Sequence, residues 1–202
     1  MAESLVQVTE GSGKKLHTWQ RTIGANNVED EAVFPGEYPL ASYSAIAGSV
    51  ALATANSHLF QLMAGASLNV RIRRIRLRLL TPPAAVTIGQ IQLFRLTTAG
   101  TGGTAVTARP YDTADAAAGA AGMTLPTVKG TEGVQLLDES LWYGTAALPV
   151  PVHDEFTWEQ HPGEKPIIIP AGTANGLALK NPGALAAATV SIRIEFVETS
   201  FS

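Results

Sequence analysis

The sequence predicts an all-β protein built as an antiparallel sandwich or barrel, and three observations carry this prediction. Apolar and polar residues alternate over several short segments, most clearly at residues 68–80 and 189–198. Glycine, proline and asparagine separate these segments at short intervals, as turns do. No long segment repeats convincingly with the period of a helix, and 202 residues are enough for one sizeable core.

Composition narrows the classes of function. A formal net charge of −3 and a pI of about 5.8 argue against a strongly basic nucleic-acid binder. The chain has no cysteine, so disulfides, thiolate metal sites and cysteine nucleophiles are excluded. No apolar run approaches the roughly 18 residues that span a membrane, and the first residues do not resemble a secretory signal. A charged fraction of 15%, with 19 glycines and 12 prolines, is typical of a tightly assembled β protein.

The chain is predicted to have an N-terminal arm or edge segment at residues 1–40 and a β-sandwich domain at residues 41–202. The arm is polar and irregular apart from a short strand expected at residues 16–23. Its acidic run, Glu29, Asp30 and Glu31, is soon followed by the turn-forming stretch FPGEYP. Segments of this kind often become ordered only against a neighbouring chain.

Turn residues and alternation place the strands of the second domain. Residues 99–103, AGTGG, are expected to form a hairpin turn, and residues 112–122 an alanine-rich loop or one short helix. The strands are expected at residues 46–52, 58–63, 68–80, 86–97, 104–109, 123–128, 134–143, 156–160, 165–169, 176–180 and 189–198.

The segment at residues 68–80, LNVRIRRIRLRLL, is the most highly charged of these strands. The arginines stand at odd positions up to Arg73 and at even positions from Arg74 onward. One extra residue shifts the phase in this way, so we expect a β-bulge at the pair. The apolar side should face the core and the cationic side should face out. The outward residues are Arg71, Arg73, Arg74, Arg76 and Arg78.

Two alternatives accompany this segment. As a helix it would gather Leu68, Ile72, Ile75 and Leu79 on one stripe, but the β-branched residues and the period of two favour a strand. The arginines could contact nucleic acid, form a solvated or ion-paired face, or meet an acidic partner. Since five of the 14 basic residues lie here, nine basic residues stand against 17 acidic ones elsewhere. This imbalance indicates an acidic partner within the protein or in a neighbouring copy.

Two stretches carry a resemblance to a known class of proteins. Residues 165–201, KPIIIPAGTANGLALKNPGALAAATVSIRIEFVETSF, and residues 102–120, GGTAVTARPYDTADAAAGA, are similar to segments of jelly-roll structural proteins of tailed bacteriophages. The resemblance covers about residues 65–200. It implies a jelly roll in which the strand at 68–80 lies beside the strand at 189–198. Glu195 would then face one arginine across the pair.

The resemblance and the composition together give an expected function. The chain is expected to be a non-enzymatic virion structural protein assembled in the host cytoplasm: a capsid decoration (cement) protein that forms a homo-oligomer, a trimer. Its expected partners are other copies and the major capsid protein or another virion protein, with no nucleic acid, membrane, cofactor or metal. The expected protein–protein interface is Arg71, Arg73, Arg74, Arg76 and Arg78. One alternative is a tail, baseplate or head-fibre protein. Another is a carbohydrate-binding jelly-roll module that uses Trp142, Tyr143 or Trp158.

Other motifs are weaker candidates for chemistry. In HDEFTWEQH, a strand would place His153, Glu155, Thr157, Glu159 and His161 on one face, where a metal could bind as in a cupin. A polar outer face explains the same pattern. The dipeptide Ser57-His58 lacks a nucleophile elbow, and the stretch from Asp112 to Asp115 is explained by Asx turns. The adjacent acids Asp138 and Glu139 would face opposite ways on a strand, which disfavours a glycosidase pair.

Overall fold

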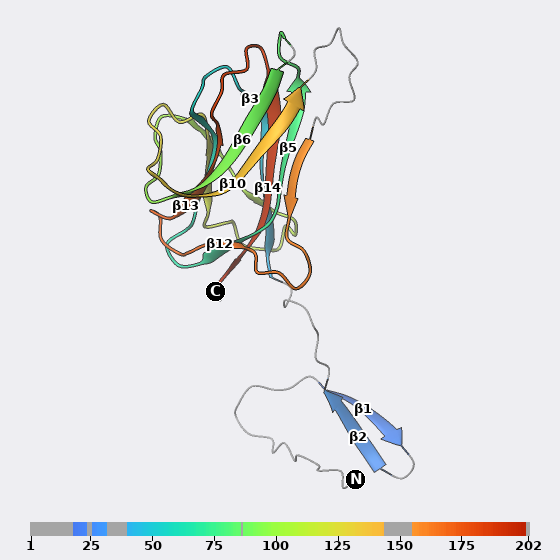
Figure 1. Cartoon of the computed structure of the whole chain (residues 1–202). Helices are drawn as coiled ribbons and strands as arrows, with labels where there is room; N and C mark the ends of the chain where they lie inside the picture. Colours follow the sequence, from blue (N-terminus) through green and yellow to red (C-terminus); the bar gives the residue numbers. More distant parts are fainter. Residues whose placement is uncertain (1–17, 24–25, 32–39, 86, 144–154, 201–202) are drawn as a thin grey trace. The chain divides into compact units, whose positions relative to one another are not determined.

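The computed structural model describes residues 18–23, 26–31, 40–85, 87–143 and 155–200 (Figure 1). The chain divides into two compact units, Met1–Pro39 and Leu40–Ser202. We describe each unit by itself. Over the described residues there is no helix that is long and apolar enough to cross a membrane.

The first unit contains an antiparallel hairpin. Strand β1 (Thr18–Ile23) pairs with β2 (Asn26–Glu31) along the whole length of both strands. A short strand was expected near β1, whereas β2 was not expected as a strand. Acidic residues and asparagine have low strand propensity, and here the hydrogen bonds to β1 outweigh that preference.

The second unit is a sandwich of two antiparallel sheets, which confirms the all-β prediction. Sheet I contains, in spatial order, β11 (Glu155–Glu159), β5 (Asn69–Thr81), β14 (Thr189–Thr199), β3 (Ser42–Ala51) and β8 (Arg109–Pro110), with β12 (Ile167–Ile169) also paired to β5. Sheet II contains β10 (Glu132–Tyr143), β6 (Thr87–Leu96), β13 (Gly176–Asn181), β4 (Ser57–Met63), β9 (Ala121–Thr124) and β7 (Thr104–Val106).

The longer strands of the second unit pair in a nested order. The first, β3, pairs with the last, β14, and the next strand inward, β4, pairs with β13. Further inward β5 pairs with β11, and β6 pairs with β10. The chain therefore runs as one long antiparallel ribbon that is folded over to make both sheets.

The core lies between the two sheets and is filled by the apolar sides of the strands. In β14, four alternating residues have exposed fractions of 1% or less, as the sequence predicted: Val190, Ile192, Ile194 and Phe196. In β5, Ile75 and Leu77 are fully buried, while Leu79 is partly buried against the same core. Arg95 of β6 joins the sheets at one end, because its Nη1 donates to the carbonyl oxygen of Ile168 at 2.6 Å.

Strand β5 has the predicted neighbour and the predicted bulge. It pairs with β14 in antiparallel register, so that Arg74 faces Glu195 while Ile72 faces Phe196. Arg73 is the extra residue between these two pairs. The strand assignment and the change of phase at the arginine pair are both confirmed.

Two predicted elements of the middle of the chain are wrong. Residues 99–103 are not a hairpin turn, because β6 and β7 are separated by β13, β4 and β9. The expected strand at 104–109 is split into β7 and β8, which belong to different sheets. Of the two alternatives given for the alanine-rich stretch, a loop or a short helix, the loop is observed over residues 112–120. Glycine-rich sequence favours a change of direction but does not say which strand comes next.

Residues 97–103 lie instead against residues 125–131, and we call these two segments the covering loops. The amide nitrogen of Thr97 donates to the carbonyl oxygen of Thr131 at 3.0 Å, and Thr101 and Val128 exchange two backbone hydrogen bonds. The loops meet Gln61 of β4, since Gly100 donates its backbone N–H to Gln61 Oε1 at 2.9 Å. The loops thus cover part of the face of sheet II that is turned away from the core, around Gln61.

Candidate functional site

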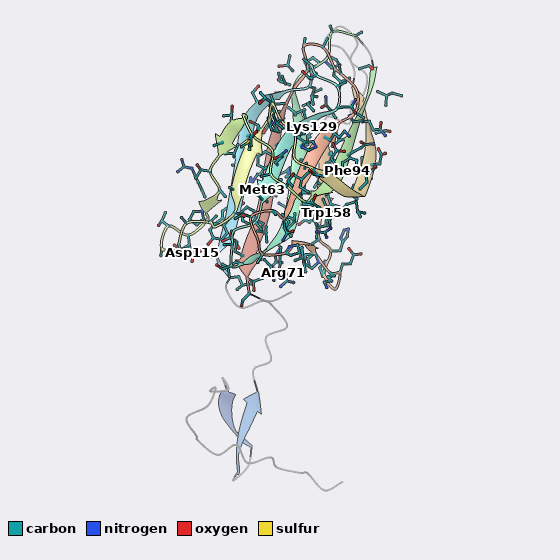
Figure 2. The ribbon with its side chains drawn as sticks, turned by 90° about the vertical axis from the view of Figure 1, so that its left-hand side faces the viewer. Met63, Arg71, Phe94, Asp115, Lys129 and Trp158 are labelled. Atoms are coloured by element: carbon teal, nitrogen blue, oxygen red, sulfur yellow. The ribbon has the colours of Figure 1, made fainter. Side chains whose placement is uncertain are left out.

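The predicted interface lies on the side of β5 that is turned away from the core. Because Ile75 and Leu77 are buried in the core, the alternation of a strand places Arg74, Arg76 and Arg78 on the opposite side of sheet I. We call the outer surface formed by the five arginines of β5 the arginine face. Arg71 lies at one end of the arginine face, near the bottom of the sandwich in Figure 2, whereas Lys129 lies in the upper part.

Strand β11 supplies carboxylates to the arginine face. Its register places Glu155 opposite Arg78, and Glu159 opposite Arg74. Arg76 donates from Nε at 2.8 Å and lies with Nη2 at 2.6 Å from the same Oε1 of Glu155. Arg74 donates from Nη2 to Oε1 of Glu159 at 2.6 Å. The two outward glutamates of β11 therefore neutralise part of the arginine face.

Strand β14 adds a third carboxylate. Glu195 was expected to face one arginine of β5, and that arginine is Arg74, whose Nη1 lies 3.8 Å from Oε2 of Glu195. Its Oε1 lies 2.8 Å from Nε of Arg193, one pair further along the same face. Arg193 also donates from Nη2 to the hydroxyl of Tyr111 at 2.5 Å and lies over the Tyr111 ring.

These contacts set the ionisation of the face. A hydrogen bond from Arg76, with a second from Thr157, lowers the pKa of Glu155 below its usual value. A hydrogen bond from Arg74 likewise lowers the pKa of Glu159, and that glutamate in turn raises the pKa of Arg74. These shifts favour the charged forms of Glu155, Glu159 and Arg74, and the face carries exposed ion pairs.

The acidic residues of β11 were predicted to share one face of a strand, as candidate metal ligands or as a polar outer face. Glu155, Thr157 and Glu159 do share one side of the strand, as expected. Their partners are arginines of β5, and within the described parts of the chain no three metal-binding side chains come together. His161 is exposed, and His153 lies outside the described residues. The sequence did contain a sign of this pairing: the glutamates of β11 recur every second residue, as Arg74, Arg76 and Arg78 of β5 do.

A second cluster of polar side chains, which was not predicted from the sequence, lies on sheet II. His58 of β4 is fully buried, and its Nε2 lies 2.9 Å from Oε1 of Glu132. Its Nδ1 lies 2.6 Å from Nε2 of Gln61. Lys180 of β13 donates to Oε2 of Glu132 at 2.9 Å and lies over the ring of Phe94, which Figure 2 labels. We call His58, Gln61, Glu132 and Lys180 the buried network.

The direction of each hydrogen bond in the buried network is fixed. Since Gly100 donates to Gln61 Oε1, the amide group of Gln61 must donate to Nδ1 of His58. Nδ1 is then an acceptor, so the proton of the neutral ring sits on Nε2 and is donated to Glu132. The network joins the covering loops to β4, β10 and β13, and its hydrogen bonds converge on Glu132, which accepts from His58 on one side and from Lys180 on the other.

Burial and charge act in opposite directions in this network. Burial lowers the pKa of His58, and the hydrogen bond to Glu132 offsets only part of that shift. Burial alone would raise the pKa of Glu132, but hydrogen bonds from Lys180 and His58 outweigh it and lower the pKa. The stable state is a neutral histidine beside an ionised glutamate that is paired to lysine.

Comparisons of the chain with protein-family models, with curated proteins and with solved structures find no match in any of the three.

The remaining candidates have structural explanations. Ser57 donates from Oγ to Asn181 Oδ1 at 2.7 Å, while the ring of His58 is used by the buried network, so the two do not act on each other. Asp112 forms the expected Asx turn, because its Oδ1 accepts the backbone N–H of Ala114 at 2.9 Å. Asp138 accepts hydrogen bonds from glutamine side chains of sheet II rather than acting with Glu139.

The aromatic residues proposed for sugar stacking are only partly described. Trp158 of β11 is partly buried and packs against the hydrophobic core. The side chains of Trp142 and Tyr143 lie outside those that the structure describes. No described observation therefore favours the carbohydrate-binding alternative over a protein contact.

Proposed function

We propose that the chain is a non-enzymatic structural protein of a tailed-bacteriophage virion, and specifically a capsid decoration protein that acts as a homotrimer. The observation that supports this best is the nested pairing of β3 with β14, β4 with β13, β5 with β11 and β6 with β10. A long antiparallel ribbon rolled into two sheets is the plan of a jelly roll, the fold that the resemblance of residues 65–200 implies. The fold by itself does not assign a function, so the proposal also needs a binding surface.

The arginine face is that surface in our proposal. A guanidinium has five N–H donors, and one carboxylate takes at most two of them. Glu155 orients Arg76, and Glu159 orients Arg74. Each arginine keeps further N–H groups that can donate hydrogen bonds to a carboxylate of a neighbouring chain. The planar fork of arginine suits this use, and arginine is enriched at protein interfaces.

The mechanism of such a protein is binding alone. Each copy would contact its neighbours and the major capsid protein or another virion protein, and many small contacts would spread mechanical stress over the shell. Residues 1–40 would reach the shell or an adjacent copy. Electron microscopy of the native particle distinguishes a position on the capsid from one on the tail, the baseplate or a head fibre.

The test compares assembly with folding. The mass of the purified chain is measured by light scattering, and its binding to phage shells by co-sedimentation. Replacing Arg74, Arg76 and Arg78 by alanine should weaken association strongly while the melting temperature changes little, because exposed ion pairs add little stability. Alanine at Gln90, Gln92 and Gln135 of sheet II is the matched control and should leave association unchanged. A wild-type protein that stays monomeric and ignores shells would overturn the proposal, as would a triple variant that loses folding but not association.

A further inference from the structure

An open groove of about 470 Å³ lies between β3 and β7. One wall is formed by residues 46–50 of β3, and the other by residues 104–107 in and after β7. β7 pairs only with β9, so it is the last strand of sheet II on that side. The groove is therefore the seam where an edge of sheet I and an edge of sheet II face each other.

The β3 wall is an uncovered strand edge. On one side β3 pairs with β14 along nearly its whole length, from Ser42 to Ala51. On the other side β8 pairs only with Tyr43 and Ser44. Among the described strands, none lies beside residues 46–51 on that side. Such an edge presents backbone N–H and C=O groups to which an extended chain can hydrogen-bond.

The sequence of this edge does little to prevent pairing. Exposed edges are commonly protected by charged residues or proline, and residues 46–51, IAGSVA, contain neither. One bulge interrupts the strand, since Ala47 faces Ile192 while Val50 faces Val190. Ile46 is 55% exposed at the end of the edge, where it offers an apolar contact.

The groove lining also indicates the charge of its occupant. Its side chains are small, apolar or hydroxyl-bearing, and the single charged residue among them is Arg109. Arg109, on β8, is exposed and lies opposite Ser44 of β3. Two residues further on, Tyr111 is 55% exposed and stacks with Arg193. An aromatic residue between arginines is a composition enriched at protein interfaces.

We propose that this groove binds an extended segment of a partner protein, which adds as a strand to the free edge of β3 and places a carboxylate on Arg109. The backbone of the edge supplies the affinity, and Ile46 and Arg109 supply the selectivity. The inference stands on the groove alone and holds whether or not the arginine face binds a neighbour.

The test uses two blocked seven-residue peptides, each alternating valine and threonine around a central residue that is glutamate in one and glutamine in the other. Each is titrated into the full-length, ¹⁵N-labelled chain, and amide shifts are recorded by NMR. We expect shifts at residues 46–51 and 104–107, with the glutamate peptide binding about two- to fivefold more tightly. Arg109→Gln should remove that preference, whereas Lys165→Gln, which removes an equal charge at an exposed position outside the groove, should keep it.

A second pair of variants tests the edge itself. Ser49→Glu places a negative charge in the groove and should weaken the glutamate peptide by at least about fivefold, while Ser49→Thr should bind as the wild type does. Unchanged amide shifts elsewhere show that each variant is folded. Absence of shifts at the groove up to millimolar peptide, shifts confined to another surface, or equal affinity for both peptides would each overturn the proposal.

Discussion

The outer surfaces of the two sheets carry similar residue types but use them in different ways. On sheet I, Arg76 and Glu155 form an ion pair in which the side chains remain 43% and 33% exposed. On sheet II, the ring of His58 is wholly buried and Lys180 is only 13% exposed. The difference comes from the covering loops, which lie over part of sheet II and shield the buried network from water.

Exposure decides what each surface can do. Charged groups in water exchange partners at little cost, so the arginine face can bind a new carboxylate without unfolding anything. Buried polar groups lose much more when a partner is removed, because water does not replace it. The buried network should therefore determine stability, and the arginine face should determine association.

The largest effect is expected from Gln61→Leu. The substitution nearly preserves volume but leaves the N–H of Gly100 and Nδ1 of His58 without their partners. Two unsatisfied buried groups should lower the free energy of unfolding by about 2–4 kcal/mol, measured by urea denaturation.

Gln135→Leu is the matched control for that variant. Gln135 is exposed on the same sheet, and its amide donates to Asp138 at the surface. Its replacement should change stability by no more than about 0.5 kcal/mol. Equal losses for the two variants would show that the buried network contributes nothing special.

The next effect is expected from Gly100→Ala, which tests the docking of the covering loops. A Cβ at this position would come within 2.7 Å of both the Gln61 amide nitrogen and the carbonyl oxygen of Val128. Overpacking of this kind should lower stability by about 1–3 kcal/mol. Gly183→Ala, where a Cβ would meet nothing within 4 Å, should leave the urea midpoint unchanged. If Gly100→Ala is equally silent, the loops do not hold the geometry described above.

Acid should destabilise the second unit through His58. Its pKa is lowered from the usual 6.5 in the folded protein, so the unfolded chain takes up the proton first as the pH falls. Stability is then complete above about pH 7 and declines below it, by at most about 1.4 kcal/mol per pH unit for one proton. The groups that face the ring are Glu132, Lys180 and Lys129, and the two lysines oppose a charged imidazole.

Urea midpoints measured between pH 7.5 and pH 5 in about half-unit steps would reveal this decline. His58→Gln should flatten the curve, whereas His161→Gln, at an exposed position, should keep the wild-type slope. The lowered pKa of Glu132 adds a further loss at pH values below its usual 4.5. A His58→Gln protein with an unchanged slope would mean that another group controls the acid response.

The contrast between the two sheets also explains which parts of the fold the sequence could predict. In β5 and β14 one side of the strand is buried and the other is not, so alternation identified the faces and the bulge at the pair Arg73 and Arg74. The resemblance implied that these two strands are neighbours, and the register that sets Glu195 opposite Arg74 came only from the structure. The glycine-rich residues 99–103 gave no such information. They could serve a hairpin or a crossing loop equally well, and the choice depended on strands far along the chain.

The same limit applies to the two polar clusters. Arg76 and Glu155 are 79 residues apart in the sequence, and His58 and Glu132 are 74 apart. No local motif links residues at such separations, and only the sheet topology brings them together. The sequence does show a histidine and a glutamine within the apolar stretch HLFQLM at residues 58–63. This pattern indicates that His58 is buried but does not identify its partner.

The smallest effect is expected from the ion pair between Arg76 and Glu155. A double-mutant cycle with Arg76→Gln and Glu155→Gln should give a coupling of about 0.2–1 kcal/mol at low ionic strength. It should approach zero in 1 M NaCl, where the screening length is about 3 Å. A parallel cycle with Lys180→Gln and Glu132→Gln should give a larger coupling that salt changes less, because that pair is more buried. If the Arg76–Glu155 coupling proved as large and as insensitive to salt as the Lys180–Glu132 coupling, Arg76 would mainly stabilise its own sheet. Its N–H donors would then not be available to bind a neighbouring chain.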